Sequence, residues 1–382
     1  MNQSPLLPGL SSYASTSNES TGYATRREFA GAVAAAGIAA LFPWMKAIAQ
    51  TGNNARRIDV HHHYVPPAYA AFARANNQSP GPSLGDRAGN GVPWDLNKDL
   101  DDMDKSGTAV ALQSITTPGF WYGKPEEVRK VMRECNDFGT KLRTDHPGRF
   151  GLFASIPLSD TDGALKEIEY SLDTLKADGI GLFSNYRDKW LGHESFAPVY
   201  QELNRRKAVV FVHPITGACC GNLVPGVADT LVDYGADTTR TIGSLIYSGT
   251  SSKYPDIKWI FSHGGGVMPF VIERFLGGTQ AEIVPGIVTK GQDGTPPKNA
   301  PQGTLAELRK MYFDTAQASN PVAMGALRQV VPVSQILFGT DYWYRTAAET
   351  ARGLVTSKVF NDAELRMINR GNAERLLPKY KG

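Results

Sequence analysis

The sequence predicts a single (β/α)8 barrel, an α/β fold in which eight parallel strands alternate with helices. Three observations lead to this prediction. Eight short runs of β-branched and aromatic residues recur along the chain, and a polar–apolar stretch of helical period follows most of them. Strands that alternate with helices form a parallel sheet. The first run ends in histidines, and not in the glycine-rich turn of a doubly wound sheet, which favours a closed barrel.

The expected elements follow one another along the chain without a linker. The eight expected strands are 57–63, 110–115, 150–156, 179–185, 208–214, 258–264, 311–316 and 336–341. The expected helices are 126–146, 162–177, 195–206, 267–276 and 321–331. Two connections, about 64–105 and about 277–305, are too long for simple loops. We expect them to be insertions over the barrel mouth, after strands one and six.

The first 50 residues have the pattern of an export signal. Two adjacent arginines precede a small, apolar run at 30–42, which is typical of a twin-arginine signal peptide. The run is shorter than the ~20 residues that a membrane-spanning helix needs, so we expect no stable membrane insertion after cleavage. The expected domains are therefore a signal peptide at 1–50 and a barrel at 51–382, with the mature protein in the periplasm.

The charge balance argues against a nucleic-acid partner. The chain has 40 Lys and Arg and 37 Asp and Glu, which gives a formal net charge of +3, so no overall field attracts a polyanion. Of its three cysteines, Cys219 and Cys220 are adjacent, and the set shows neither a disulfide framework nor the spacing of a structural zinc site. We interpret the cysteines as packing residues.

Polar residues at the ends of the expected strands predict a metal site, because functional groups in such a barrel lie at the C-terminal ends of strands. His61 and His63 are two apart on strand one and point to the same side, so His62 points away. His213 ends strand five and Asp341 ends strand eight. These donors suit one divalent ion, Zn²⁺ in the first instance and Mn²⁺ as the alternative, with a coordination position left open for water or substrate.

Each of these histidines also has a simpler interpretation. A lone histidine at a strand end is more often a hydrogen-bonded core residue than a ligand. The joint occurrence of His-x-His on the first strand, His-Pro on the fifth and Gly-Thr-Asp on the eighth favours the metal site over that interpretation.

These motifs resemble the amidohydrolase superfamily, and within it the decarboxylating branch typified by aminocarboxymuconate-semialdehyde decarboxylase. The similar segments extend over most of the chain after residue 50. They are Ile-Asp-Val-His-His-His at 58–63, Val-His-Pro at 212–214, Ser-His-Gly-Gly-Gly at 262–266 and Gly-Thr-Asp-Tyr at 339–342. Cys-Cys-Gly-Asn at 219–222 and Trp-Leu-Gly at 190–192 look most like 6-methylsalicylate decarboxylases.

The resemblance implies a metal-dependent, non-oxidative decarboxylase of a small 2-hydroxyaromatic acid such as 6-methylsalicylate. It gives the acid–base role to His263, with Asp341 as the competing proton donor. It also implies that Arg274 binds the substrate carboxylate in the neighbouring subunit's site, and hence a homodimer. The second arginine that this family carries early in the chain has no counterpart at 94–105.

Two further inferences concern the metal count and the alternative reaction. Two-metal members of the superfamily bridge their ions with a lysine at the end of strand four, and 181–185 contains none, so a single ion is expected; Lys189 is the nearest lysine downstream. The main alternative is a hydrolase that uses a metal-activated water against a lactone, ester or amide. A metal-binding protein without catalysis is the third reading.

Overall fold

The computed structural model describes residues 55–78, 94–276 and 298–382, which belong to one compact unit, Ala47–Gly382. The expected signal peptide at 1–50 lies outside the described residues, as do parts of both expected insertions. No helix in the described ranges is long and apolar enough to cross a membrane.

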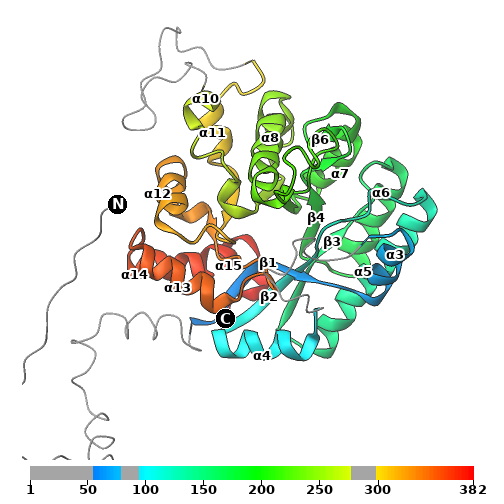
Figure 1. Cartoon of the computed structure of the whole chain (residues 1–382), viewed down its shortest axis with the longest axis horizontal. Coiled ribbons are helices and arrows are strands. Elements are labelled where there is room, and N and C mark those ends of the chain that lie inside the picture. The colour runs from blue at the N-terminus through cyan, green and yellow to red at the C-terminus, as the bar shows by residue number, and fades with distance from the viewer. Residues whose placement is uncertain (1–54, 79–93, 277–297) are drawn as a thin grey trace, which may run out of the picture. The chain divides into compact units, whose positions relative to one another are not determined.

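Eight parallel strands form one sheet that curves into a nearly closed barrel (Figure 1). In sheet order they are β1 (Arg57–Tyr64), β2 (Thr108–Ile115), β3 (Phe150–Ser155), β4 (Gly179–Phe183), β7 (Val209–His213), β8 (Lys258–Phe261), β9 (Tyr312–Asp314) and β10 (Ile336–Leu337). The two ends of the sheet meet where the Val60 N–H donates to the Phe338 carbonyl at 3.0 Å and the His63 N–H to the Tyr342 carbonyl at 3.1 Å. The predicted (β/α)8 fold is confirmed.

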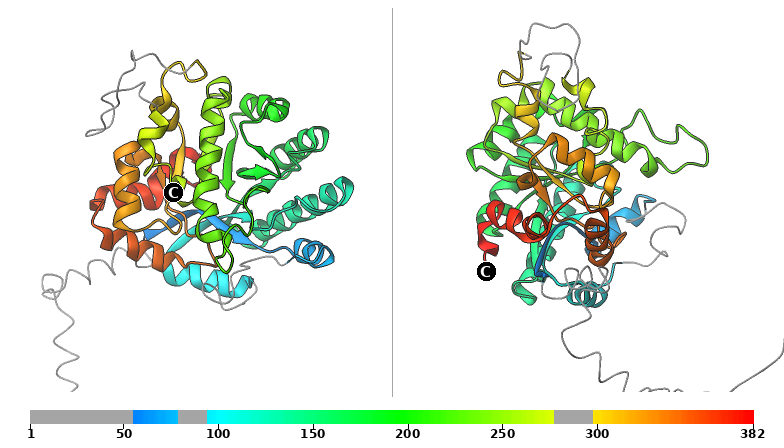
Figure 2. Two further views of the ribbon diagram at one scale, coloured as in Figure 1. Left: turned by 45° about the horizontal axis from the view of Figure 1, so that its top comes forward. Right: turned by 90° about the vertical axis from the view of Figure 1, so that its left-hand side faces the viewer.

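Helices surround the strands, as Figures 1 and 2 show from three directions. They are α3 (Pro67–Ala75), α4 (Leu96–Ser106), α5 (Pro125–Asp145), α6 (Thr161–Glu169), α7 (Ala197–Arg205), α8 (Asp233–Tyr247), α9 (Thr250–Lys253), α10 (Ile272–Leu276), α11 (Thr304–Leu308), α12 (Pro321–Val330), α13 (Ala347–Ser357), α14 (Asp362–Arg366) and α15 (Asn372–Leu376). With helices outside and side chains filling the inside, every residue of β1 is buried.

Two buried apolar clusters divide the barrel. The larger one lies between the strands and the surrounding helices. The smaller one fills the barrel interior with alternate strand residues, among them Ile58, Val60, Phe153, Phe211 and Leu337. The Phe211 ring lies 5.0 Å from the ring of His61. The apolar interior therefore forms the floor under the polar residues at the C-terminal ends of the strands.

The loop from β7 to α8 corrects the interpretation of two cysteines. Cys219 and Cys220 are joined as a disulfide between adjacent residues, whereas Cys135 is a free, buried thiol. Cys220 is buried and Cys219 is exposed. Spacing rules did not indicate this bond, because they describe cysteines that are separated in sequence.

Candidate metal and active site

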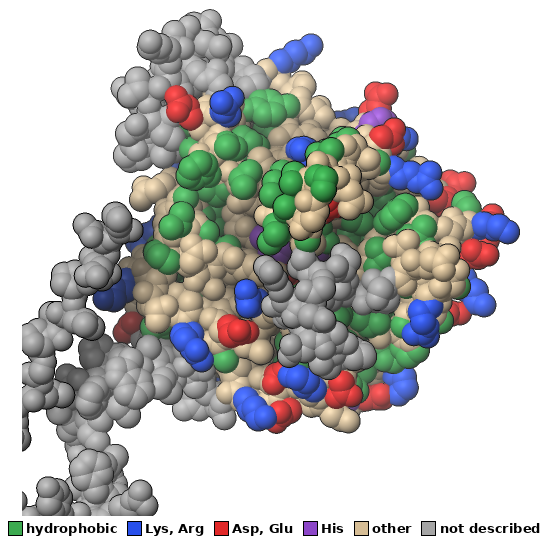
Figure 3. Space-filling view, in the orientation of Figure 1, with side chains coloured by type: hydrophobic (Ala, Val, Ile, Leu, Met, Phe, Trp, Pro, Cys, Tyr) green, Lys and Arg blue, Asp and Glu red, His purple; other side chains and the backbone are tan. Residues whose placement is uncertain are grey.

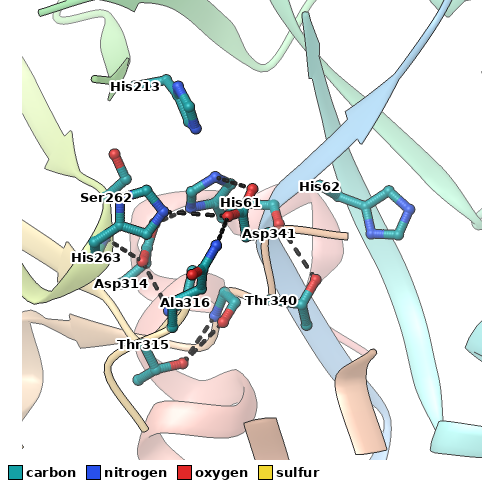
Figure 4. A network of polar contacts seen from close by, with 12 residues as sticks. His61, His62, His213, Ser262, His263, Asp314, Thr315, Ala316, Thr340 and Asp341 are labelled. Carbon is teal, nitrogen blue, oxygen red and sulfur yellow. Dashed lines mark hydrogen bonds and ion pairs between the residues drawn. The ribbon is translucent and has the colours of Figure 1, made fainter. Parts of the chain in front are cut away.

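Four donor groups from three parts of the barrel converge at its C-terminal end. His61 and His63 extend from β1, His213 from the last residue of β7, and Asp341 from the turn after β10. One ligand atom from each lies within 4.8 Å of every other, and all four residues are buried. Figure 4 shows His61, His213 and Asp341 facing a common space, with His62 turned away. The structure thus brings together the four predicted ligands.

The histidines are held so that one ring nitrogen of each can bind an ion. His61 Nδ1 lies 2.8 Å from Asp314 Oδ2, and His213 Nδ1 lies 2.8 Å from the Pro214 carbonyl. His63 Nδ1 lies 3.3 Å from the Ser114 carbonyl. A carboxylate or carbonyl oxygen accepts a hydrogen bond, so Nδ1 carries the hydrogen and the lone pair lies on Nε2. In this tautomer each of the three histidines offers one Nε2 lone pair to an ion.

The electrostatics of the site also favour a bound cation. Asp341 Oδ1 is buried and accepts no hydrogen bond, although Nε2 of His63 lies only 3.0 Å away. His61 Nε2 and His63 Nε2 are 3.1 Å apart. Lone pairs at these separations repel unless positive charge lies between them. The residues present therefore fit a divalent ion with nitrogen and oxygen ligands.

Burial and neighbouring charge shift the pKa values of the buried donors, in directions that differ from one residue to the next. Burial opposes a charge on His61, but the carboxylates of Asp314 and Asp341 outweigh it and raise the pKa of His61 to about 10. Burial raises the pKa of Asp341, yet the facing imidazoles, His61 first, hold it well below its ordinary value. Burial and three neighbouring imidazoles lower the pKa of His213 well below its ordinary value. The surroundings therefore favour an ionised Asp341 and a neutral His213, the forms in which these side chains can bind a cation.

His263 stands at the edge of this group. Its Nε2 lies 3.3 Å from Asp341 Oδ2, and its ring centroid lies 5.1 Å from that of His61. It is partly exposed and does not belong to the set of converging ligand atoms. Its backbone has a positive φ of 56°, in a tight turn that continues through three glycines. An imidazole in this position can exchange a proton with a ligand beside the metal donors.

Two residues that the sequence analysis did not single out support the donors. Asp314, the last residue of β9, accepts from His61 Nδ1 and from the backbone N–H of His263 at 2.9 Å. The side-chain amide of Gln317 donates to Asp341 Oδ2. Asp314 ends the seventh strand of the barrel, just as Asp341 follows the eighth. The rule that functional groups lie at the C-terminal ends of strands could therefore have found Asp314 from the sequence.

His62 belongs to a separate polar cluster behind the site. Its Nδ1 lies 3.0 Å from Asp59 Oδ2 and its Nε2 lies 2.9 Å from Asp99 Oδ1. Its ring stacks on Tyr342 with centroids 4.5 Å apart. The Thr340 hydroxyl also donates to Asp59, at 2.6 Å. This cluster ties β1 to the turn that carries Asp341 and so fixes the spacing of the ligands.

A cavity of about 340 Å³ opens over His213, His263 and Asp341. Figure 3 shows histidine side chains at the base of a hollow with hydrophobic side chains beside it. Two phenol rings border the cavity: Tyr234 lies 5.9 Å from the His213 ring and Tyr344 lies 6.2 Å from the His63 ring, both edge to face. The volume is at the lower end of the range of small-molecule sites.

Two basic residues that the sequence analysis considered lie outside this cavity. Arg274 is exposed on α10 and is not among the residues that line the cavity. Lys189 belongs to the short strand β6 (Lys189–Trp190) and lines a different cavity. Among the residues that the structure describes, no lysine lines the cavity over the ligands.

Comparison with known proteins gives consistent matches over the same residues. The family model described as amidohydrolase matches residues 58–379. The chain is 34% identical over 345 residues to "Decarboxylase macB" of Penicillium terrestre, covering 85% of this chain and 96% of that protein. It is 34% identical over 338 residues to "6-methylsalicylic acid decarboxylase" of Penicillium expansum, covering 85% and 97%.

A solved structure agrees in fold. The 5-carboxyvanillate decarboxylase of Novosphingobium aromaticivorans, complexed with manganese and 4-hydroxy-3-methoxy-5-nitrobenzoic acid, superposes with a TM-score of 0.73. The two chains are 19% identical, and the match covers 86% of this chain and 98% of the other.

The expected location in the periplasm is wrong. Relatives with which this chain aligns over 85% of its length are proteins of the fungi Penicillium and Aspergillus, whereas twin-arginine export is a bacterial route. The pattern at 1–50 on which the expectation depended lies outside the described residues. An arginine pair before an apolar run is a short pattern that arises without an export function.

Proposed function

The chain belongs to the amidohydrolase family, and we propose that it is a metal-dependent, non-oxidative decarboxylase of a small 2-hydroxyaromatic carboxylic acid such as 6-methylsalicylate. The observation that carries the proposal is an imidazole, that of His263, which lies beside four converging metal donors and lines the same small cavity as His213 and Asp341. The names of the two relatives at 34% identity support the choice of reaction and substrate.

We infer that His61, His63, His213 and Asp341 hold one divalent ion. Three imidazoles and one carboxylate are a donor set that Zn²⁺ accepts readily, and Mn²⁺ is the alternative because the similar solved structure contains it. When bound, the ion supplies a Lewis acid and a template for the substrate's carboxylate and ortho oxygen. Asp314 acts through His61 by fixing its tautomer.

The cavity walls orient the ring and limit its size. Tyr234 and Tyr344 stand edge to face against two of the ligand histidines, so a flat aromatic ring can lie between the phenols. Burial raises the pKa of Tyr234 to about 12, so this phenol stays neutral and serves as a hydrogen-bonding wall. A volume of about 340 Å³ suits a single substituted ring.

His263 delivers the proton that the reaction needs. Loss of CO₂ from an aryl carboxylate requires a proton on the carbon that bears the carboxylate. The C–C bond then breaks, its electron pair restores the aromatic ring, and CO₂ leaves. Asp341 Oδ2, 3.3 Å from His263 Nε2, can stabilise the imidazolium before this transfer. Asp341 itself is the competing donor.

We also propose a homodimer in which Arg274 reaches the neighbouring subunit's site. Arg274 is exposed and lies outside its own chain's cavity. Phe270, four residues earlier, is 84% exposed, and Val267 is 44% exposed. Apolar side chains gathered on one exposed segment are typical of a surface that another protein covers.

A substrate panel tests the reaction. Purified, metal-analysed protein is incubated with 6-methylsalicylate, with 2-methylbenzoate, which lacks the ortho hydroxyl, and with a simple lactone. We expect CO₂ and 3-methylphenol in equal amounts from the first compound alone. If the lactone is opened and neither acid releases CO₂, the protein is a hydrolase and the proposal is wrong.

A further inference from the structure

We infer that Arg345 binds the substrate's carboxylate from within the same chain, and so makes the cavity prefer the acid over its phenol product. The inference rests on the proposed function, since it concerns the same cavity. Among the described residues, Arg345 is the only Lys or Arg that lines this cavity.

The chain around Arg345 positions it at the cavity rim. Arg345 follows Asp341 by four residues, and its backbone N–H donates to the Asp341 carbonyl at 3.3 Å. The next helix, α13, begins at Ala347. The base of the side chain is therefore tied to the turn that carries a metal donor, while the guanidinium can move at the opening.

Among the described residues the guanidinium has one acidic partner, Glu349, in a long and exposed ion pair. Its nearest carboxylate oxygen is Oε1 of Glu349, at 3.9 Å, and its side chain is 51% exposed. Glu349 is engaged elsewhere, because its Oε2 accepts from the Thr346 N–H at 2.8 Å and from the Thr346 hydroxyl at 3.0 Å in a capping box. Arg345 therefore keeps its donors available for a ligand.

The charge in the cavity calls for one more cation when an acid binds. A divalent ion is balanced by the carboxylates of Asp341 and Asp314 (+2 − 2 = 0), and both phenols on the walls are neutral. A bound substrate adds one negative charge at its carboxylate, and among the described residues of the same chain only Arg345 supplies a matching positive side chain at the cavity. Guanidinium and carboxylate match in shape as well as charge.

The consequence is a difference between substrate and product. The acid can contact both Arg345 and an ion held by the four metal donors. The phenol that remains after CO₂ loss has no carboxylate for Arg345 to bind. A hydrogen bond between charged groups changes affinity by about 10- to 100-fold. Arg345 therefore raises the affinity for the acid by that factor and leaves the affinity for the phenol unchanged. The product then dissociates more readily than the substrate.

Binding in a protein that cannot turn over the acid tests the inference. In a His263→Asn background, the dissociation constants of 6-methylsalicylate and 3-methylphenol are measured by calorimetry, with and without Arg345→Ala. We expect Arg345→Ala to raise the dissociation constant of the acid about 10- to 100-fold and that of the phenol less than about 2-fold. Arg345→Lys should recover part of the acid's affinity, because it keeps the charge without the planar fork.

Arg352→Ala is the matched control, since Arg352 is an exposed arginine on α13 that does not line the cavity. It should leave both constants unchanged. If Arg345→Ala weakens acid and phenol equally, or neither, while the folded protein keeps its metal, Arg345 is not the carboxylate partner. CO₂ release by the unmodified protein is measured separately, and its absence would overturn the proposed decarboxylase function. An unchanged affinity for the acid in Arg345→Ala would overturn only the role of Arg345.

Discussion

At the scale of single residues, the proposed function assigns binding of the ion and transfer of the proton to different histidines. His213 gives its Nδ1 hydrogen to the Pro214 carbonyl at 2.8 Å and has only Nε2 left for a ligand, whereas His263 lies outside the converging ligand atoms. The two histidines occupy neighbouring positions, with ring centroids 5.6 Å apart, but their surroundings differ. Substitution at each should therefore affect a different measurable quantity.

His213→Ala should lose the bound metal, and His263→Asn should keep it. Removing one of four donors leaves an incomplete coordination shell, whereas His263 contributes no ligand atom to that set. Loss of a general acid lowers turnover by about 10²- to 10⁴-fold. Metal analysis of the two purified variants, together with their CO₂ release, checks both statements. A His263→Asn protein without metal would mean that His263 is itself a ligand.

The residues that could be predicted are those whose direction follows from strand geometry. His61 and His63 point to one side because side chains alternate along a strand, and His213 and Asp341 come at strand ends. Gln317 and Arg345 lie in turns after the strands, where no periodicity applies. Gln317 and Asp341 have positive φ values of 49° and 64°, and such turns depend on contacts that sequence patterns do not contain.

At the scale of elements, long helices and buried strands were predicted more closely than the ends of strands. The helix expected at 126–146 is α5, Pro125–Asp145, while the strand expected at 336–341 ends at Leu337. Strands six, seven and eight end at Phe261, Asp314 and Leu337, and the mostly buried residues that follow continue into the turns that carry His263, Gln317 and Asp341. Helix α8 was not predicted, since the buried residues of its first half are polar and its buried apolar residues come only at Ile242, Leu245 and Ile246.

The interface between α5, β3 and α6 depends on one buried amide. Asn136 on α5 is fully buried and pairs with the Ser155 backbone, its amide donating to the carbonyl and its oxygen accepting from the N–H, each at 2.9 Å. The same amide donates to Glu167 on α6 at 2.8 Å. One side chain therefore satisfies polar groups on two other elements.

Asn136→Ala should lower the free energy of unfolding by about 2–4 kcal/mol, because the buried Ser155 N–H and carbonyl lose their side-chain partner and Glu167 loses one of its donors. Urea unfolding measures the change. Gln201→Ala, which removes an exposed amide from α7, is the control and should change stability by less than about 0.5 kcal/mol. An equal, small effect for both variants would show that the Asn136 network contributes little. Metal content should be unchanged in each.

At the scale of the whole molecule, the count and order of strands were enough to predict the barrel. The repeated strand–helix alternation allows few topologies, and a right-handed parallel barrel is the one that brings all strand ends to one mouth. The subunit arrangement could not be predicted from such a pattern, because it depends on which exposed side chains gather on one surface. Phe270 and Val267, next to Arg274, form such a group.

Mixing two inactive variants tests whether Arg274 acts in the neighbouring subunit. Arg274→Ala and His263→Ala should each be inactive alone. In a mixed dimer, one of the two sites keeps both groups if the arginine acts across the interface, so CO₂ release should partly return. If the subunits demonstrably exchange and no activity appears, Arg274 serves its own chain's site or is structural. The same mixing with Arg345→Ala and His263→Ala should restore nothing, because both groups belong to one chain's site.

The central claim is that a single ion in the four-donor site supports decarboxylation, and a titration tests it most directly. Protein freed of metal by chelation receives increasing amounts of Zn²⁺, or of Mn²⁺ in a parallel series, while CO₂ release from 6-methylsalicylate is followed. The account predicts that the initial rate rises in proportion to added metal and levels off at one ion per chain. Full CO₂ release by the metal-free protein, or a plateau at two ions per chain, would contradict it.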